Sequence, residues 1–145
     1  MRAELVDTSG NRFLTITLDD RNQWIQANWQ GSLTEVAVKA GMQAYTEALE
    51  EADYNALLID TRSAEGCWSH SLDWALNVWA PQAAAAGLQY YALVVNPASL
   101  KAASTDGFYA QVQWFEAEVF ADLATARAWL RRKRYLKENN SYLHS

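Results

Sequence analysis

The chain has 145 residues and a net charge of −5 at pH 7. That length fits one ordinary domain, which buries roughly two thirds of the surface exposed by its unfolded form. A single cysteine excludes an internal disulfide bond, and two histidines far apart in sequence give no zinc or iron cluster spacing. We therefore expect no cofactor and no metal, in a reducing, cytoplasmic setting.

The N-terminal segment lacks the apolar run of a signal peptide. No stretch approaches the roughly 18 apolar residues that a membrane span requires. No membrane span is therefore expected.

The charge is unevenly distributed along the chain. Residues 127–145 contain six basic residues and one acidic residue, a sum of +5, so the other 126 residues carry −10. Because nonspecific nucleic-acid binding depends on phosphate neutralisation by lysine and arginine, the acidic part argues against a nucleic-acid partner. The basic segment is an exception to this argument, and its structural explanation is that cations near the end of a helix suit the helix dipole and the acidic part of the chain.

The first part of the chain predicts strands followed by a helix. Residues 12–20 and 23–31 alternate apolar and polar side chains, which indicates a β-hairpin of half-buried strands, and a shorter strand is expected at 3–8. Ser32 and Glu35 fit a capping box, and apolar residues then recur at helical spacing. This predicts an amphipathic helix of four to five turns.

The second part of the chain predicts strands that alternate with helices. The expected elements are a buried central strand at 54–60, a helix at 71–87 that Pro81 kinks or restarts, a second central strand at 88–97, a short helix at 99–112, an edge strand at 114–120 and a last helix capped by Asp122. The whole order predicts one α/β domain with a mixed sheet and about four flanking helices. The domain is expected over residues 1–135, with a flexible tail at 136–145.

Four motifs support a family resemblance: LLIDTR at 57–62, WAP at 79–81, AGLQYYALVVNP at 86–97 and VFADLATARAWL at 119–130. Together they resemble small bacterial STAS/SEC14-like proteins, also called SpoIIAA-like, over roughly residues 10–131. The resemblance implies a mixed sheet of four to five strands flanked by helices. In anti-sigma-factor antagonists of this fold, the loop after the central strand carries a phosphorylated serine and docks a kinase, whereas SEC14-like relatives hold a lipid in an apolar cavity.

Asp60, Thr61, Arg62 and Ser63 lie at the carboxyl end of a predicted central strand, before a helix start. Sheets of α/β proteins usually bind ligands or partners at such a position. The alternative is a structural turn, in which Asp60 pairs with Arg62 or caps the turn. Ser69 or Ser71 would then cap the helix.

The resemblance also makes Ser63, Ser69 and Ser71 candidate phosphate acceptors, although Gly66 and Cys67 stand near the position expected for the acceptor. A phosphate at a helix start is electrostatically favoured but needs a partner that recognises it.

Catalysis is not predicted for this segment. Cys67 and His70 are the right residue types, but neighbours in sequence do not face each other on a helix, and the chain has no Gly-x-Ser-x-Gly motif.

Three tryptophans, Trp68, Trp74 and Trp79, follow the central strand. Trp74 and Trp79 lie about 140° apart around a helix, so the helix presents aromatic rings to two sides. Core packing, a homodimer surface or a cleft for an apolar ligand would each explain this arrangement.

The sequence thus predicts a non-catalytic regulatory or partner-binding module that contacts an unknown protein partner. The predicted contact residues are Asp60, Arg62, Ser63, Trp68, Ser69, Ser71 and Trp74. The alternative is a carrier or sensor of a small apolar or lipid-like ligand.

Overall fold

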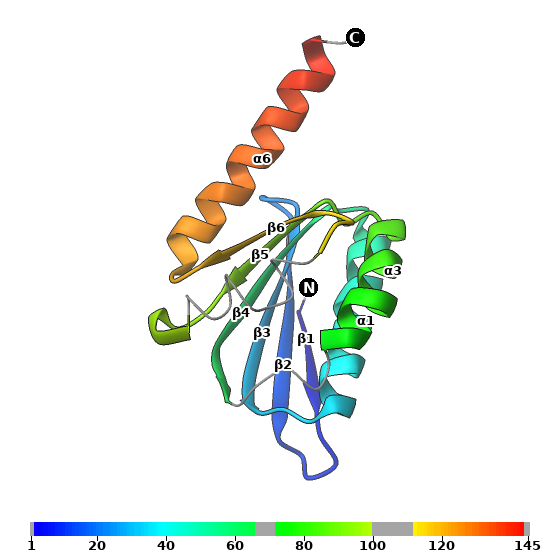
Figure 1. The fold of residues 1–145 in the computed structure, drawn as a ribbon, viewed down its shortest axis with the longest axis vertical. Coiled ribbons are helices and arrows are strands. Elements are labelled where there is room, and N and C mark those ends of the chain that lie inside the picture. The colour runs from blue at the N-terminus through cyan, green and yellow to red at the C-terminus, as the bar shows by residue number, and fades with distance from the viewer. Residues whose placement is uncertain (1, 66–71, 100–111, 144–145) are drawn as a thin grey trace.

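The computed structural model describes residues 2–65, 72–99 and 112–143. Six strands form one sheet in chain order: β1 (Arg2–Val6), β2 (Arg12–Asp19), β3 (Trp24–Ser32), β4 (Ala56–Glu65), β5 (Tyr90–Val94) and β6 (Glu116–Phe120). β1, β2 and β3 are antiparallel neighbours, and β3, β4, β5 and β6 are parallel neighbours (Figure 1). The predicted mixed α/β sheet is confirmed, with six strands rather than four to five.

The helical elements are α1 (Glu35–Ala52), α2 (Leu72–Trp74), the π-helix η2 (Ala75–Trp79), α3 (Ala80–Ala85), the 3₁₀ turn η3 (Pro97–Ser99) and α6 (Leu123–Leu143). α1 has the predicted length, but its cap is Thr34, whose hydroxyl accepts from the Ala37 N–H at 3.1 Å. The capping box that was expected to begin at Ser32 is wrong, because β3 continues through Ser32. The helix predicted at 99–112 lies mostly outside the described residues.

α6 continues to Leu143, so the backbone of residues 136–143 is helical where the sequence predicted a loose tail. In Figure 1 this end of α6 extends beyond the strands. The division of the chain into a domain and a tail stays a prediction.

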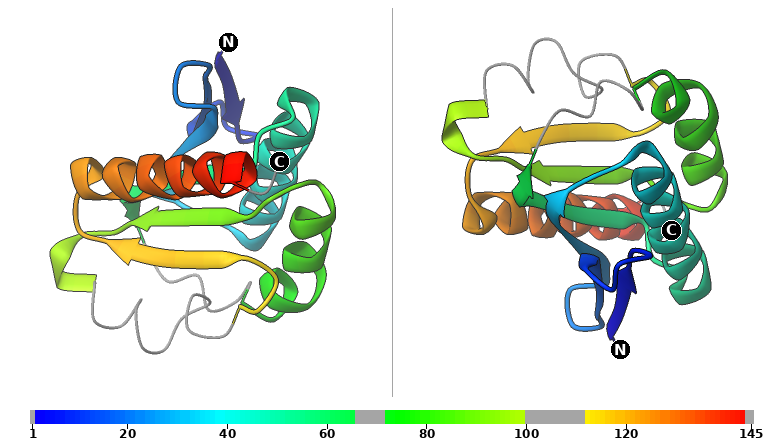
Figure 2. Two further views of the ribbon diagram at one scale, coloured as in Figure 1. Left: turned by 90° about the horizontal axis from the view of Figure 1, so that it is seen from above. Right: turned by 90° about the horizontal axis from the view of Figure 1, so that it is seen from below.

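Helices cover both faces of the parallel half of the sheet. α1 and α3 lie on one face and α6 on the other, over β4, β5 and β6 (Figure 2). In β4, Leu57 and Ile59 point into the core beneath α1 and α3, whereas Leu58 points into a second core beneath α6. All of residues 56–60 are buried, which confirms the prediction of a central strand covered on both faces.

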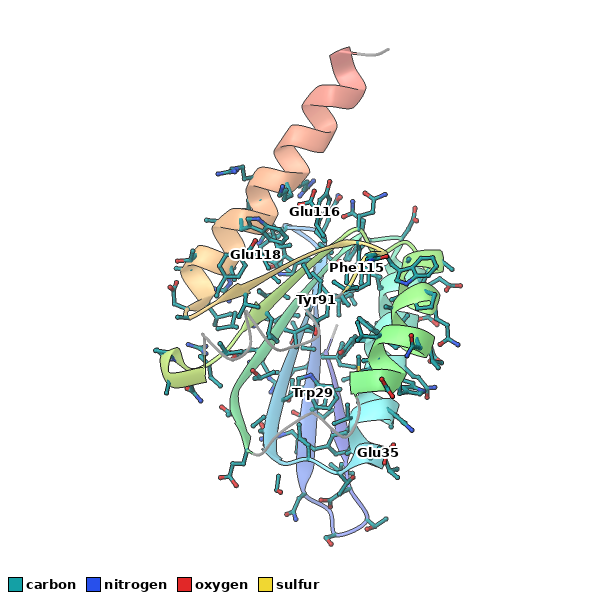
Figure 3. All side chains as sticks on the ribbon, viewed as in Figure 1. Trp29, Glu35, Tyr91, Phe115, Glu116 and Glu118 are labelled. Atoms are coloured by element: carbon teal, nitrogen blue, oxygen red, sulfur yellow. The ribbon has the colours of Figure 1, made fainter. Side chains whose placement is uncertain are left out.

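Aromatic rings fill the larger core. Trp29, Tyr45, Trp79 and Tyr91 form a chain of edge-to-face contacts with centroid separations of 5.8 to 6.3 Å. Phe115 packs on both Trp79 and Tyr91 at 5.9 Å; Trp29, Tyr91 and Phe115 are labelled in Figure 3. Of the three explanations considered for the tryptophans, core packing therefore applies to Trp79, which is buried.

The predicted irregularity at Pro81 is present. Just before it, the Ala80 N–H donates to the Ala75 carbonyl, a π-type bond that widens the helix by one residue. Proline has no N–H and its ring crowds the preceding turn, so a wider turn accommodates it and α3 restarts the helix.

Gly41 permits the closest approach of α1 to the sheet. A Cβ atom at this position would overlap the Trp29 indole and lie 2.8 Å from Leu14 Cδ2.

We expect Gly41→Ala to lower the free energy of unfolding by about 1–3 kcal/mol, because neither buried side chain has room to move. Urea denaturation measures this loss. Gln43→Ala, at an exposed site of the same helix, is the control and should change the value by less than about 0.5 kcal/mol; equal losses would contradict the packing argument.

Candidate functional site

β4 continues past the point where the sequence predicted a turn. Asn28 of β3 is in register with Asp60, but Gln30 is in register with Ser63, so β4 contains one extra residue and forms a bulge. β5 pairs with β4 only as far as Asp60. The turn expected at residues 60–63 is therefore wrong: the segment is strand, paired with β3 and extended beyond β5.

Asp60 and Arg62 form a bidentate ion pair within this bulge. Arg62 Nε donates to Asp60 Oδ1 at 3.0 Å and Nη2 donates to Oδ2 at 2.8 Å, while the Arg62 backbone N–H donates to Oδ1 at 3.0 Å. The Asp60 residue is only 5 % exposed, whereas the Arg62 side chain is 37 % exposed. Hydrogen bonding to Asp60 raises the pKa of Arg62 above its ordinary value. The predicted pairing of Asp60 with Arg62 is confirmed.

Two further side chains bond to the backbone at the bulge. Thr61 Oγ1 donates to the Val94 carbonyl at 2.9 Å, and Asn96 Nδ2 donates to the Arg62 carbonyl at 3.3 Å. Both bonds join β4 to the end of β5 where the regular ladder has stopped. These bonds were not predicted: the sequence placed Thr61 only within the segment 60–63 and Asn96 only within the motif at 86–97.

The start of α6 lies at the same end of the sheet. Asp122 accepts hydrogen bonds from the Thr125 N–H at 2.8 Å and from the Thr125 hydroxyl at 2.9 Å, which confirms its predicted capping role. These bonds, with a smaller contribution from Arg62, lower the pKa of Asp122. Arg62 thus interacts with two carboxylates, the buried Asp60 and the exposed Asp122.

Trp74 lies on the opposite side of the sheet from Asp60. It is half-buried against the core beneath α1 and α3, and Lys39 Nζ is 5.6 Å from its ring centroid. Lys39 also pairs with Glu35 at 2.9 Å. The structure therefore places Trp74, in α2 after β4, and the Asp60–Arg62 pair, within β4, on different faces of the sheet.

The remaining predicted contact residues are only partly described. Ser63 is an exposed residue of β4. Trp68, Ser69 and Ser71, like Cys67 and His70, lie outside the described residues, so their roles stay predictions. We use the name carboxyl edge for the exposed positions Arg62, Ser63 and Glu65, together with Trp74.

Two kinds of feature, a metal-ligand cluster and a membrane-spanning helix, are absent from the described part of the chain. Within residues 2–65, 72–99 and 112–143, no group of three His, Cys, Asp or Glu side chains is placed to hold a metal ion. No helix in these ranges combines the length and the apolar character of a membrane span.

The Asp60–Arg62 pair should contribute more to stability than an exposed pair. We expect Arg62→Met to lower the free energy of unfolding by about 1–2 kcal/mol, because the buried carboxylate loses both guanidinium donors and keeps only the backbone N–H of residue 62, while partial exposure of the guanidinium limits the loss. Arg12→Met, which removes an exposed pair with Glu4, is the matched control and should cost less than about 1 kcal/mol. Urea denaturation compares the two variants, and equal losses would contradict the structural role of Arg62.

The cap of α6 should depend on pH. Because the pKa of Asp122 is lowered in the folded state, its stabilising effect is present above the ordinary value of 3.8 and is lost as the pH falls through the lower folded value. The difference in urea midpoint between wild type and Asp122→Ala should therefore be larger near neutral pH than in strong acid. A difference that does not change with pH would show that the carboxylate charge is not what stabilises α6.

No protein-family model and no curated protein sequence matches the chain. Among solved structures, an anti-sigma factor antagonist from Mycobacterium paratuberculosis is similar, with a TM-score of 0.58 and 19% identity. The match covers 88% of this chain and 99% of the antagonist.

An uncharacterised protein of the DUF3478 family from Shewanella loihica, described as having a SpoIIAA-like fold, is also similar. Its TM-score is 0.51 at 16% identity, and the match covers 81% of this chain and 94% of that one. At these identities the likeness concerns the fold. The chain therefore has the mixed α/β fold of SpoIIAA-like, or STAS, domains.

Proposed function

We propose that this chain is a non-catalytic regulatory module that binds a protein partner through the carboxyl edge. The observation that carries the proposal is the match in fold to an anti-sigma factor antagonist over nearly all of that protein. An antagonist of this kind acts by binding, so the same fold here supports a binding role. The surface that makes the contact is the carboxyl edge.

The geometry of β4 supports this surface. Beyond Asp60 the strand leaves β5 and continues beside β3, which presents Arg62, Ser63 and Glu65 at the end of the sheet. The bulge is fixed by the Asp60–Arg62 pair and by Thr61 and Asn96. A surface held by a rigid frame loses little conformational entropy when a partner binds.

The same contacts favour binding over catalysis. Both carboxylate oxygens of Asp60 accept hydrogen bonds from Arg62, so this buried acid is engaged as a structural partner rather than poised as a general base. Trp79, one of the three tryptophans considered for an apolar cleft, packs against Tyr45 and Tyr91 in the core. A protein partner is therefore the better-supported ligand.

Affinity capture with matched baits tests the proposed contact. Ser63→Arg places bulk and charge on the carboxyl edge, and Trp74→Ala removes its aromatic ring. Val6→Arg is the control, because Val6 is 58% exposed on β1, at the far edge of the sheet. We expect wild type and Val6→Arg to capture the same partner proteins. The captured amount of these proteins should fall about tenfold with each carboxyl-edge variant, a change equivalent to about 1.4 kcal/mol in binding free energy.

Quantitative mass spectrometry of the captured proteins reads this result, and thermal unfolding confirms that each bait is folded. If all four baits capture the same proteins equally, or if wild type captures none above empty resin, the proposed contact is wrong.

A further inference from the structure

Three arginines lie on one flank of α6. Arg127, Arg131 and Arg134 are spaced i, i+4 and i+7, which places them in one stripe along a helix. Arg131 Nε donates to Asn22 Oδ1 at 3.1 Å, and Arg134 Nη1 donates to the Arg21 carbonyl at 3.2 Å. Both contacts are to the turn between β2 and β3, so this arginine flank faces the antiparallel half of the sheet.

The arginine flank keeps hydrogen-bond donors for a ligand. Arg131 donates through Nε to Asn22, and its Cζ lies 5.7 Å from the centroid of the Trp24 ring. Its two terminal nitrogens bond to no residue in the described ranges. Arg127 is half-buried and makes no hydrogen bond to any described residue. Burial raises the pKa of Asp19, but hydrogen bonds from Asn22 and the nearby charge of Arg127 outweigh this and leave it lowered.

The sheet beside this flank is polar. On the face that carries α6, β2 contributes Thr15 and Thr17, and β3 contributes Gln26 and Asn28. Thr15 is in register with Asn28 and Thr17 with Gln26, and all four are half-buried. Because α6 packs over β4, β5 and β6, these hydroxyl and amide groups lie next to the helix rather than beneath it.

We propose that the arginine flank and these four polar residues bind an acidic segment of a protein. Guanidinium groups bind carboxylates bidentately, and hydroxyl and amide side chains can both donate to and accept from a peptide backbone. A nucleic acid or an anionic membrane fits less well, because its negative charges are more closely spaced than those of a mixed acidic segment and are repelled more strongly by the charge of −10 on residues 1–126.

This surface is separate from the carboxyl edge. Its arginines adjoin the β2–β3 turn, where β3 begins at Trp24, whereas the carboxyl edge lies toward the other end of β3, near Ser32; Asn28, in register with Asp60, is the polar residue nearest that edge. The proposal shares with the proposed function the idea of a protein partner, but the two surfaces can be tested independently.

Fluorescence anisotropy with a rhodamine-labelled peptide of alternating Glu and Ser tests the inference at low salt. A peptide of alternating Gln and Ser is the uncharged comparison. The double variant Arg127→Gln/Arg131→Gln should bind the acidic peptide about tenfold more weakly, because two charge-assisted contacts are lost.

Arg132→Gln is the matched control, because Arg132 is an exposed neighbour on the same helix that lies off the stripe. It removes one charge and should weaken binding by no more than about twofold. Arg131→Lys keeps the charge but loses the planar fork, so its affinity should fall as well. Circular dichroism confirms that each variant is folded.

Several results would overturn the inference. One is equal affinity for the acidic and uncharged peptides. Another is a loss of affinity in Arg132→Gln equal to that in the double variant Arg127→Gln/Arg131→Gln. The third is tighter binding of an oligothymidylate of the same length. Ser63→Arg should bind the peptide as wild type does. Failed partner capture with intact peptide binding would therefore contradict only the carboxyl-edge proposal.

Discussion

The Asp60–Arg62 pair determines how the central strand behaves where it loses a neighbour. As far as Asp60, β4 lies between β3 and β5, and every residue from 56 to 60 is buried. Without the pair, the Asp60 carboxylate would lie buried without its guanidinium partner. The backbone groups of β4 after Asp60 also have no strand partner on the β5 side. The Arg62 guanidinium satisfies the carboxylate, and the bulge keeps β4 paired with β3. The position of the carboxyl edge depends on this arrangement.

The two halves of the sheet solve different burial problems. The parallel half is covered on both faces, and its central strand β4 is apolar from Ala56 to Ile59. The antiparallel half has one covered face, so Thr15, Thr17 and Asn28 alternate with apolar residues and remain partly exposed. Each proposed surface lies at a boundary: the carboxyl edge where β5 ends, and the arginine flank where the cover given by α6 ends.

Several parts of the fold could be predicted because their signals are local. Alternation along β2 and β3 gave the hairpin, the missing N–H of Pro81 gave the irregular helix, and Asp122 gave the start of α6. The edge strands β1 and β6 were also expected from local pattern, at 3–8 and 114–120, so the count of four to five strands, which came from the family resemblance, was too low. Thr34 displaced Ser32 as the cap because pairing with β4 extended β3, an effect that local sequence does not contain.

The sequence by itself determined the order of the elements, the central position of β4 and the pairing of Asp60 with Arg62, since each follows from periodicity or from residues two positions apart. Only the tertiary structure decided that residues 60–63 are strand rather than turn, that Trp74 and Asp60 lie on opposite faces, and that Arg127 and Arg131 lie beside β2 and β3. The physical reason is that these features depend on which segments distant in the chain pack together. Register across a parallel pair and the face covered by a helix are properties of that packing, and no local pattern encodes them.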